Sequence, residues 1–213
     1  AFDACGVGTA GVDDTMLEAL ARKGDGRYLV VAEDTDVSLA KELAGAFRPA
    51  ARNVKVQVRF NPDRVGKFHL LGFEKHRLAE QDFRDDTVDA AELAAAEQGN
   101  ALYQVELLPG GSGEIGDVAV RFQDTATGKM VERHWTIPYD ANTPTLDRAA
   151  PPMQLAATAG LLAEALKGSP LGNLVRLKDL RAQTLPMRGA FPGDEAVATL
   201  LKMVDKASSL KGE

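Results

Sequence analysis

The segment AFDACGV (residues 1–7), followed by DDTMLEALARK (13–23) and RYLVV (27–31), decides the fold class at the start of the chain. The first and third pieces are apolar runs typical of strands, and the second is an amphipathic helix. A further helix is expected from Thr35 to Phe47. Strand, helix, strand and helix with short links indicate a parallel sheet covered by helices. We therefore predict an α/β layer over residues 1–50.

This layer has only two strands, whereas a parallel sheet is normally covered on both faces. After Asn53 the sequence supplies no further strand–helix units, and the chain begins with Ala1 rather than methionine. We expect residues 1–50 to be the C-terminal end of a domain, and the whole chain to be the C-terminal piece of a longer protein. An active site built upstream of Ala1 would not be visible in this sequence.

The composition restricts the class of protein. The 213 residues are 45% hydrophobic and 26% charged, as in an ordinary globular protein. A net charge of −6 without a basic cluster argues against a nucleic-acid partner, because such binding depends on Lys and Arg neutralising phosphates. The apolar runs are far shorter than the ~20 residues of a transmembrane helix. The single cysteine, Cys5, excludes an internal disulfide, and its apolar neighbours predict a buried thiol.

Residues 53–140 are predicted to form a β domain. Apolar and polar side chains alternate from Val54 to Phe60, from Val118 to Phe122 and from Val131 to Ile137, and apolar runs lie at 65–73 and 103–107. Such alternation predicts strands with one buried face, which in the first strand is the face of the valines opposite Lys55, Gln57 and Arg59. Short links without a long helix between strands favour an antiparallel sandwich.

Two parts of this region are less regular. The link at 124–128 contains a glycine and is typical of a hairpin. The segment 89–99 is rich in alanine and glutamate, which favour helix, but it is too short to sustain a helix without packing. We expect at most one or two helical turns there.

The tail, residues 150–213, is predicted to be helical. It follows a linker that contains Pro144, Pro151 and Pro152. The expected helices are Met153–Lys167, Leu174–Gln183 and Asp194–Leu210, the last with Asp194 as its N-cap. The α/β layer (1–50), the antiparallel sandwich (53–140) and the helical tail (150–213) together predict an α+β fold.

The last helix carries an apolar stripe that needs a partner. The stripe consists of Val197, Leu200, Leu201 and Val204. A tail of this size is too small for a core of its own, so we expect the stripe to cover the exposed face of residues 1–50. A second copy of the chain or a separate upstream fragment are the alternative covers for that face.

Gly6-Val7-Gly8-Thr9-Ala10-Gly11 spells the dinucleotide-binding fingerprint between a strand and a helix. Glu33 and Asp34 end the next strand at an offset that would reach a ribose hydroxyl. However, Asp13 and Asp14 put negative charge where a pyrophosphate would bind, and no further strand–helix units complete a nucleotide domain. A glycine-rich turn is therefore favoured. A nucleotide-dependent enzyme that uses Gly6, Gly8 and Gly11 is the alternative function.

Two stretches suggest metal ligands. Asp36-Val37-Ser38-Leu39-Ala40 is close to a magnesium-ligating Asp-x-Ser-x-Ser, but Ala40 offers no oxygen, so an N-cap role for Thr35 or Asp36 is favoured. Five acids crowd eleven residues further on: Asp82, Asp85, Asp86, Asp89 and Glu92. Arg84 stands at the third position of the calcium-loop pattern and its glycine is missing. A calcium site is the alternative there to a solvated acidic turn, because calcium needs ~6–8 oxygens.

The sequence shows no catalytic constellation. His69, His76 and His134 have no metal-ligand spacing. His69 and His134 fall at outward positions of predicted strands, which predicts surface histidines. No serine lies in a Gly-x-Ser-x-Gly elbow.

The sequence resembles a known family. Residues 6–8, 13–21 and 23–28 look like the last strands and helices of a bacterial von Willebrand factor type A domain. Beyond them the chain is similar to the C-terminal region of YfbK-like proteins, often labelled homologues of calcium-activated chloride channel regulators. The residues that carry this likeness are Val54–Pro62, Leu71–Glu74, Arg77–Ala79, Asp82-Phe83, Asp86, Val88–Ala90, Glu92-Leu93, Ala101–Tyr103 and Gly168–Pro170.

The resemblance implies an envelope-associated or secreted protein with a type A domain, a β-rich domain and a helical tail. It implies a divalent metal, Mg or Ca, in the complete type A domain, whose ligands would lie upstream of this chain. No metal ligand is therefore carried over. The segment Ala94–Glu97 departs from the family, which has a stretch containing Gly and His there. Nothing in the chain could form a pore.

We therefore expect a non-enzymatic, envelope-associated binding or scaffolding protein that supports a metal-dependent type A adhesion domain. Its partner would be a protein, and no cofactor is expected within this chain. NAD, NADP or ATP would be the ligand under the alternative function, and stabilisation by one of them would distinguish the two.

Overall fold

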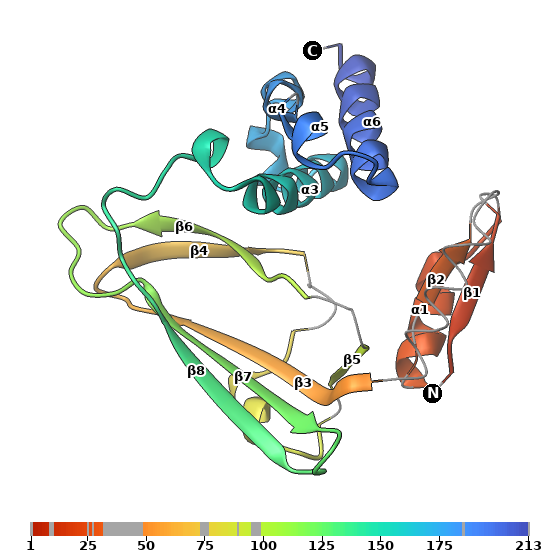
Figure 1. Ribbon diagram of the computed structural model, residues 1–213, viewed down its shortest axis with the longest axis vertical. Helices are drawn as coiled ribbons and strands as arrows, with labels where there is room; N and C mark the ends of the chain where they lie inside the picture. The colour runs from red at the N-terminus through yellow and green to blue at the C-terminus, as the bar shows by residue number, and fades with distance from the viewer. Residues whose placement is uncertain are drawn as a thin grey trace. The chain divides into compact units, whose positions relative to one another are not determined.

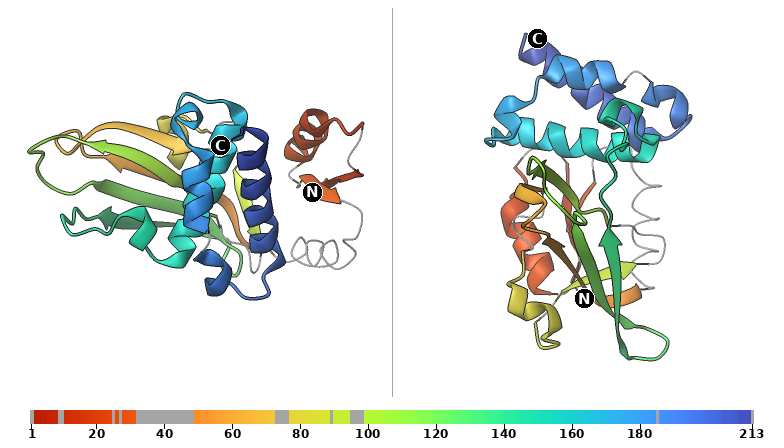
Figure 2. Two further views of the ribbon diagram at one scale, coloured as in Figure 1. Left: turned by 90° about the horizontal axis from the view of Figure 1, so that it is seen from above. Right: turned by 90° about the vertical axis from the view of Figure 1, so that its left-hand side faces the viewer.

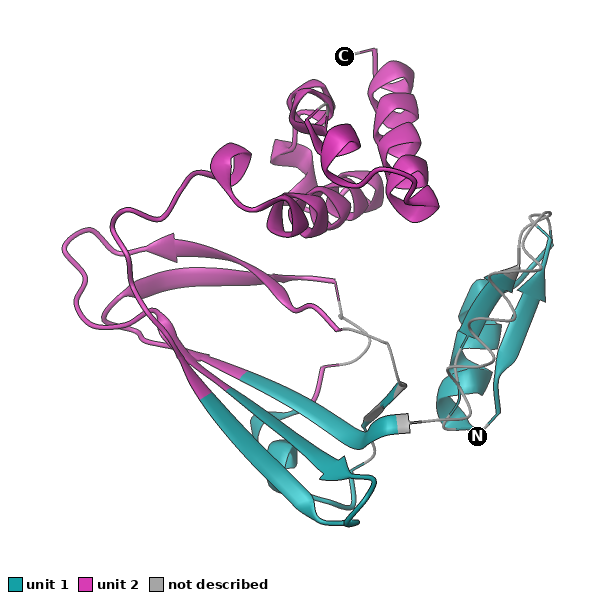
Figure 3. Cartoon of the chain, viewed as in Figure 1, with its two compact units in different colours: residues 1–57, 79–98, 119–134 teal, residues 58–78, 99–118, 135–213 magenta. Residues whose placement is uncertain are grey.

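The computed structural model describes residues 2–8, 11–24, 26, 28–31, 49–72, 77–88, 90–94, 99–184 and 186–212. It has the predicted α+β class, with helices and antiparallel sheets (Figure 1). The helix predicted at 35–47 lies outside the described residues. The chain divides into two compact units, coloured separately in Figure 3. One unit comprises residues 1–57, 79–98 and 119–134, and the other 58–78, 99–118 and 135–213.

The first unit begins with a small parallel layer, as predicted. The strand β1 (Ala4–Val7) pairs in parallel with β2 (Tyr28–Val31), and the helix α1 (Asp14–Lys23) connects them. Ala4 and Gly6 are buried on one face of β1, so the alternation of the strand leaves Cys5 exposed on the other face. The prediction of a buried thiol is wrong for this reason.

The larger sheet has four strands in the order β5–β3–β7–β8. Their bounds are Pro49–Phe60 for β3, Ala91–Ala94 for β5, Gly116–Asp124 for β7 and Met130–Ile137 for β8. The strand β5 replaces the helical turns expected within 89–99. Its antiparallel pairing with β3 supplies backbone hydrogen bonds that outweigh the helix propensity of alanine and glutamate.

The face of β3 that was predicted to lie outside is covered at Lys55, whereas Arg59 on the same face is exposed. Lys55 is only 2% exposed, whereas Val56 is 54% exposed. The alternation along the strand is as predicted, but the short 3₁₀ helix η2 (Glu80–Arg84) lies at the Lys55 side and buries Phe83 there. Register shifts between Pro49 and Val54, together with a positive φ of 51° at Asn53, mark a bulge just before Lys55.

The second unit contains a two-stranded antiparallel sheet of β4 (Val65–Leu71) and β6 (Leu102–Leu107). Phe68 and Tyr103 lie on one face of this sheet and, with Phe60, form an aromatic cluster with ring centroids 4.6–6.4 Å apart. The helix α3 (Pro151–Lys167) lies over the other face (Figures 1 and 2). It approaches closely at Gly160, where a Cβ would lie 3.0 Å from Leu71 Cδ2.

Within the described residues, the 3₁₀ turn η3 precedes the tail, which forms four helices and the 3₁₀ turn η4. They are η3 (Leu146–Arg148), α3, η4 (Gly172–Leu174), α4 (Leu177–Thr184), α5 (Met187–Ala190) and α6 (Glu195–Leu210). Pro151 and Pro152, predicted to belong to a linker, instead open α3, because the first turn of a helix needs no N–H from them. Asp194 caps α6 as predicted, and its Oδ1 accepts a hydrogen bond of 3.0 Å from the backbone N of Val197.

The helices have a core of their own, so the cover predicted for residues 1–50 is wrong. One cluster joins α3, α4 and α6 through Leu162, Ala165, Leu177, Leu180, Val204 and Ala207. A second cluster packs Val197 and Leu201 against Met187 of α5. The stripe of α6 is thus buried within the tail, because α4 and the unpredicted α5 supply the missing apolar surface. None of the helices in the described part of the chain has the length and apolar character needed to cross a bilayer.

Candidate functional site

A buried lysine anchors the acidic turn, which we define as residues 80–88. The Lys55 Nζ donates hydrogen bonds to the backbone oxygens of Asp82, at 3.1 Å, and of Asp85, at 2.5 Å. Burying an ammonium is costly unless hydrogen bonds replace its water, and these two carbonyls do so. The lysine therefore occupies a position where oxygen atoms converge on a positive charge.

The side chains of the turn are bound to protein groups as well. Asp85 Oδ1 accepts hydrogen bonds from the Thr87 hydroxyl at 2.6 Å and from the Thr87 backbone N at 2.9 Å. These bonds, with a smaller contribution from Lys55, lower the pKa of Asp85. Arg121 on β7 donates to both carboxylate oxygens of Asp86, at 2.9 and 3.0 Å. Two of the predicted calcium ligands, Asp85 and Asp86, are thus hydrogen-bonded to groups of the protein itself.

Glu132 on β8 links the turn to the sheet. Its carboxylate accepts two hydrogen bonds from Arg84, at 2.8 and 3.2 Å, lies 2.8 Å from His134 Nε2, and is 3.5 Å from Arg121. Hydrogen bonds from Arg84 are the largest cause that lowers the pKa of Glu132 to about 2. An anion held in this way has no proton to exchange near neutral pH, so the network is suited to fastening η2 and not to general acid–base catalysis.

The structure brings together only part of the predicted calcium loop. Asp82, Asp85 and Asp86 lie in the acidic turn, whereas Asp89 and the side chain of Glu92 lie outside the described residues. Within the ranges that the structure describes, no group of three or more His, Cys, Asp or Glu side chains could hold a metal ion. The calcium site therefore stays a prediction.

The sequence did not indicate the cations that complete this network. Lys55 and Arg121 sit in alternating strands, where a polar residue is normally assigned to the solvent side. The sequence did signal a charged network, because the acids are crowded between strands that contain Arg and Lys. It did not indicate which basic residue would pair with each acid.

The glycine-rich turn has structural reasons for its glycines. Gly8 and Gly11 have φ of 91° and 75°, which other residues rarely adopt. At the start of α1, Asp13 Oδ1 accepts a hydrogen bond of 3.0 Å from Met16 N, and Asp14 accepts one from the Tyr28 hydroxyl. The bond to Asp14 is the largest cause that raises the pKa of Tyr28 to about 12. Both acids that count against a nucleotide are thus fixed at the helix N-terminus.

Two of the three histidines can be compared with their prediction, because His76 lies outside the described residues. His134 is exposed, as expected. His69 on β4 is only partly exposed, and its Nε2 lies 3.6 Å from Oε2 of the buried Glu164 on α3. The prediction of a surface histidine at position 69 is confirmed only in part: 42% of the side chain is exposed, whereas Nε2 is buried on the side where α3 contacts the hairpin.

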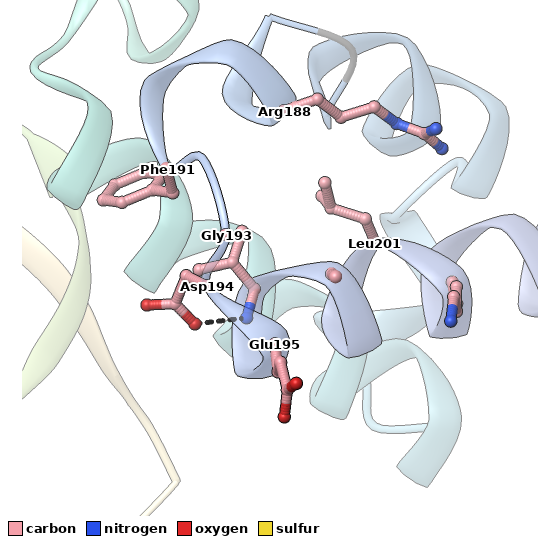
Figure 4. A pocket seen from close by; sticks show the side chains of 9 residues that line it. Arg188, Phe191, Gly193, Asp194, Glu195 and Leu201 are labelled. Carbon is pink, nitrogen blue, oxygen red and sulfur yellow. Dashed lines mark hydrogen bonds between the residues drawn. The ribbon is translucent and has the colours of Figure 1, made fainter.

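A hollow of about 420 Å³ lies at the start of α6 (Figure 4). Val197 and Leu201 belong to the apolar core beneath it, and Arg188 and Glu195 bring charge to its surroundings. The lining is completed by Phe191, Gly193, Asp194, Ala198 and Lys202. Asp194 is engaged in capping α6, and Arg188 donates to Asp205 at 3.0 Å, so these charged groups already have protein partners.

Comparison with known proteins places most of the chain in one family. The family model described as "Uncharacterized protein YfbK, C-terminal" matches residues 45–210. The uncharacterized protein YfbK of Escherichia coli (strain K12) is 29% identical over 104 residues, which are 48% of this chain and 18% of that protein. No solved structure matches the chain. Since the family model covers well over half of the sequence, the chain belongs to the YfbK C-terminal family.

Proposed function

We propose that this chain is part of a non-enzymatic, envelope-associated scaffolding protein that supports a metal-dependent von Willebrand type A domain and binds a protein partner. Membership of the YfbK C-terminal family and the resemblance of residues 6–28 to the end of a type A domain support this proposal. The geometry favours a binding role, because the charged clusters of the described residues are engaged in fastening turns and helices.

The parallel layer supports the assignment to a larger α/β domain. Val7 and Val30 on its strands are exposed, and so are Met16 and Leu20, which are four residues apart on α1. Parallel strands are normally covered on both faces, so this apolar surface suits a layer that further α/β structure completes. A magnesium or calcium ion would belong to that completed domain.

The observation that carries the binding role is the exposed aromatic face of the β4–β6 sheet. Phe68 is 61% exposed although it packs edgewise on Tyr103 and against Phe60. Large aromatic side chains anchored by neighbours but open to solvent are characteristic of protein-binding surfaces. Aromatic side chains on such a face supply a large contact area, and they lose little conformational entropy when a partner binds.

Site-specific photo-crosslinking tests the binding role. A p-benzoyl-phenylalanine at position 68 should give a discrete protein adduct in envelope fractions of cells that produce the complete polypeptide. The same probe at position 174 is the control, because Leu174 is also strongly exposed but lies in a 3₁₀ turn of the helical tail. Equal adducts at both positions, or none at position 68, would count against the proposed binding surface.

The type A assignment is tested separately. The complete polypeptide should bind magnesium or calcium with saturable heat in a calorimetric titration, whereas residues 1–213 alone should not. Absence of metal binding by the complete polypeptide would remove this part of the proposal and leave the aromatic surface to be judged on the crosslinking result.

A further inference from the structure

The outer edges of the β4–β6 sheet carry unpaired backbone groups. Among the residues that the structure describes, β4 and β6 pair only with each other. In an antiparallel pair, alternate residues of each strand direct their backbone N–H and C=O groups away from the partner strand. The helix α3 contacts both strands from one face and holds the pair in place (Figure 1). Each outer edge is therefore a supported row of hydrogen-bonding groups, which is a template for a further strand.

The side chains of β4 restrict what such a strand can be. Phe68 and Leu70 lie on the aromatic face, opposite Val105 and Tyr103 of β6, whereas the residues between them lie on the face toward α3. Phe68 is strongly exposed, and Tyr103 and Val105 are partly buried, so the aromatic face is most open beside β4. A strand added at this edge would need apolar residues at every second position to match Phe68.

The charges on the other face favour an acidic strand beside β4. There β4 carries Lys67 and His69 and no acid, whereas β6 carries Gln104 and Glu106 and no base. Opposite charges on neighbouring strands are stabilising and like charges are not. Two copies of the chain joined through β4 would bring Lys67 of one copy beside Lys67 or His69 of the other. Joining β4 of one copy to β6 of the next would match the charges, but this arrangement is head-to-tail and does not give a closed dimer through one interface.

We propose that an extended segment of a different protein adds to the outer edge of β4 as a third strand of the sheet. Its apolar residues would lie on the side of Phe68, and its acidic residues on the side of Lys67. This inference rests on the proposed function, because it specifies how the aromatic face takes a protein partner. Backbone hydrogen bonds would supply affinity, and the alternate side chains would supply selectivity.

Selection of random nine-residue peptides on the 213-residue chain tests the proposal. The enriched peptides should alternate apolar and polar residues and should carry acids at the polar positions. Two versions of the tightest peptide are then made, each N-methylated at every second backbone amide, so that each lacks donors along one edge only. One version should bind about tenfold or more weakly, and the other about as well as the parent peptide. Titration of the isotope-labelled chain, read from the amide signals of residues 66–70, measures this difference.

Lys67→Gln tests the charge preference. It should weaken binding of the acidic peptide about two- to fivefold, the range expected for one cross-strand charge pair. Lys129→Gln is the matched control, because Lys129 is also exposed but lies in the link between β7 and β8. It should leave the affinity unchanged.

Three results would overturn the proposal: selected peptides without alternation, an equal loss for both N-methylated versions, or self-association of the chain that competes with the peptide. A crosslinked adduct at position 68 together with any of these would retain the aromatic surface and reject the added strand. Edge-dependent peptide binding without an adduct at position 68 would retain the added strand and reject the envelope partner of the proposed function.

Discussion

A lysine ammonium and a calcium ion would draw on the same kind of oxygen atoms in the acidic turn. In the structure the ammonium of Lys55 donates hydrogen bonds to two backbone oxygens of the turn, and Arg121 donates to the carboxylate of Asp86. A buried cation of the protein's own therefore does locally what a bound metal would do. Arg121 in addition neutralises the Asp86 carboxylate directly, which reduces the repulsion among the acids of the turn.

Replacing Lys55 by methionine tests this role. The variant keeps the length of the side chain but removes the ammonium that donates to the carbonyl oxygens of Asp82 and Asp85, which keep only their backbone donors, Asp85 N and Val88 N. The loss of two hydrogen bonds from a charged group should lower the free energy of unfolding by about 1–3 kcal/mol. Urea denaturation measures the loss. Lys67→Met is the control, because Lys67 is exposed and pairs with Glu106 on the surface, so its loss should be about 0.5 kcal/mol or less. Equal stability of Lys55→Met and wild type would contradict the anchoring role.

Gly116 marks a position where two strands come too close for a side chain. A Cβ there would overlap the backbone oxygen of Arg59 on β3. Gly116→Ala should therefore push β7 away from β3 and destabilise the fold by about 1–3 kcal/mol. Gly99→Ala has nothing within 4 Å and should change the stability by no more than about 0.5 kcal/mol. Similar melting curves for the two variants would show that the strands are not packed as described.

At the scale of the element, α6 depends on its N-cap. Asp194→Ala removes the acceptor of the Val197 N–H and should cost about 1 kcal/mol of stability, measured by thermal or urea unfolding. Asp194→Asn keeps a side-chain oxygen at the same place and should therefore retain most of the stability that the alanine variant loses. If alanine and asparagine behaved alike, the loss would have to come from the charge at the helix terminus and not from the hydrogen bond.

The link between η2 and β8 should make the first unit sensitive to acid. Because the pKa of Glu132 is lowered to about 2, its contribution is present above the ordinary glutamate pKa and is lost as the pH falls toward 2. Glu132→Gln should therefore be less stable than wild type at neutral pH, and the gap should narrow below about pH 5. Urea midpoints at several pH values measure this. Glu106→Gln is the control, and a gap for Glu132→Gln that stays constant with pH would contradict the assignment.

Elements with a strong local pattern could be predicted from the sequence, and those decided by packing could not. Alternation located β3, β7 and β8, apolar runs located β4 and β6, and the cap at Asp194 located the start of α6. The strand β5 was missed because its alanines favour helix until β3 offers an edge to pair with. The short helix α5 was missed because four residues are too few to show a helical periodicity. The separate core of the tail, to which α5 contributes Met187, was missed for the same reason.

The candidate site was predicted only in its acidic half. Asp82, Asp85 and Asp86 form a compact cluster in the sequence, whereas Lys55, Arg121 and Glu132 come from three separate strands. Which face of a strand is covered depends on where a distant segment folds back. For this reason alternation alone placed Lys55 and His69 in solvent, although η2 covers Lys55 and α3 buries the Nε2 of His69.

At the scale of the whole molecule, the proposed role is that of a binding scaffold that holds no nucleotide of its own. The glycine turn of residues 6–11 is the feature on which the alternative enzyme depends, and its acids are fixed at the start of α1. The apolar surfaces of the parallel layer and of the β4–β6 sheet are the features on which the scaffold depends.

The melting temperature of the 213-residue chain, measured with NAD, NADP and ATP in turn, separates these two functions most directly. A ligand that binds only the folded state raises the melting temperature in a saturable way. We expect no shift with any of the three nucleotides. A saturable rise with one of them would contradict the scaffold and identify the glycine turn as the first place to look for a nucleotide site.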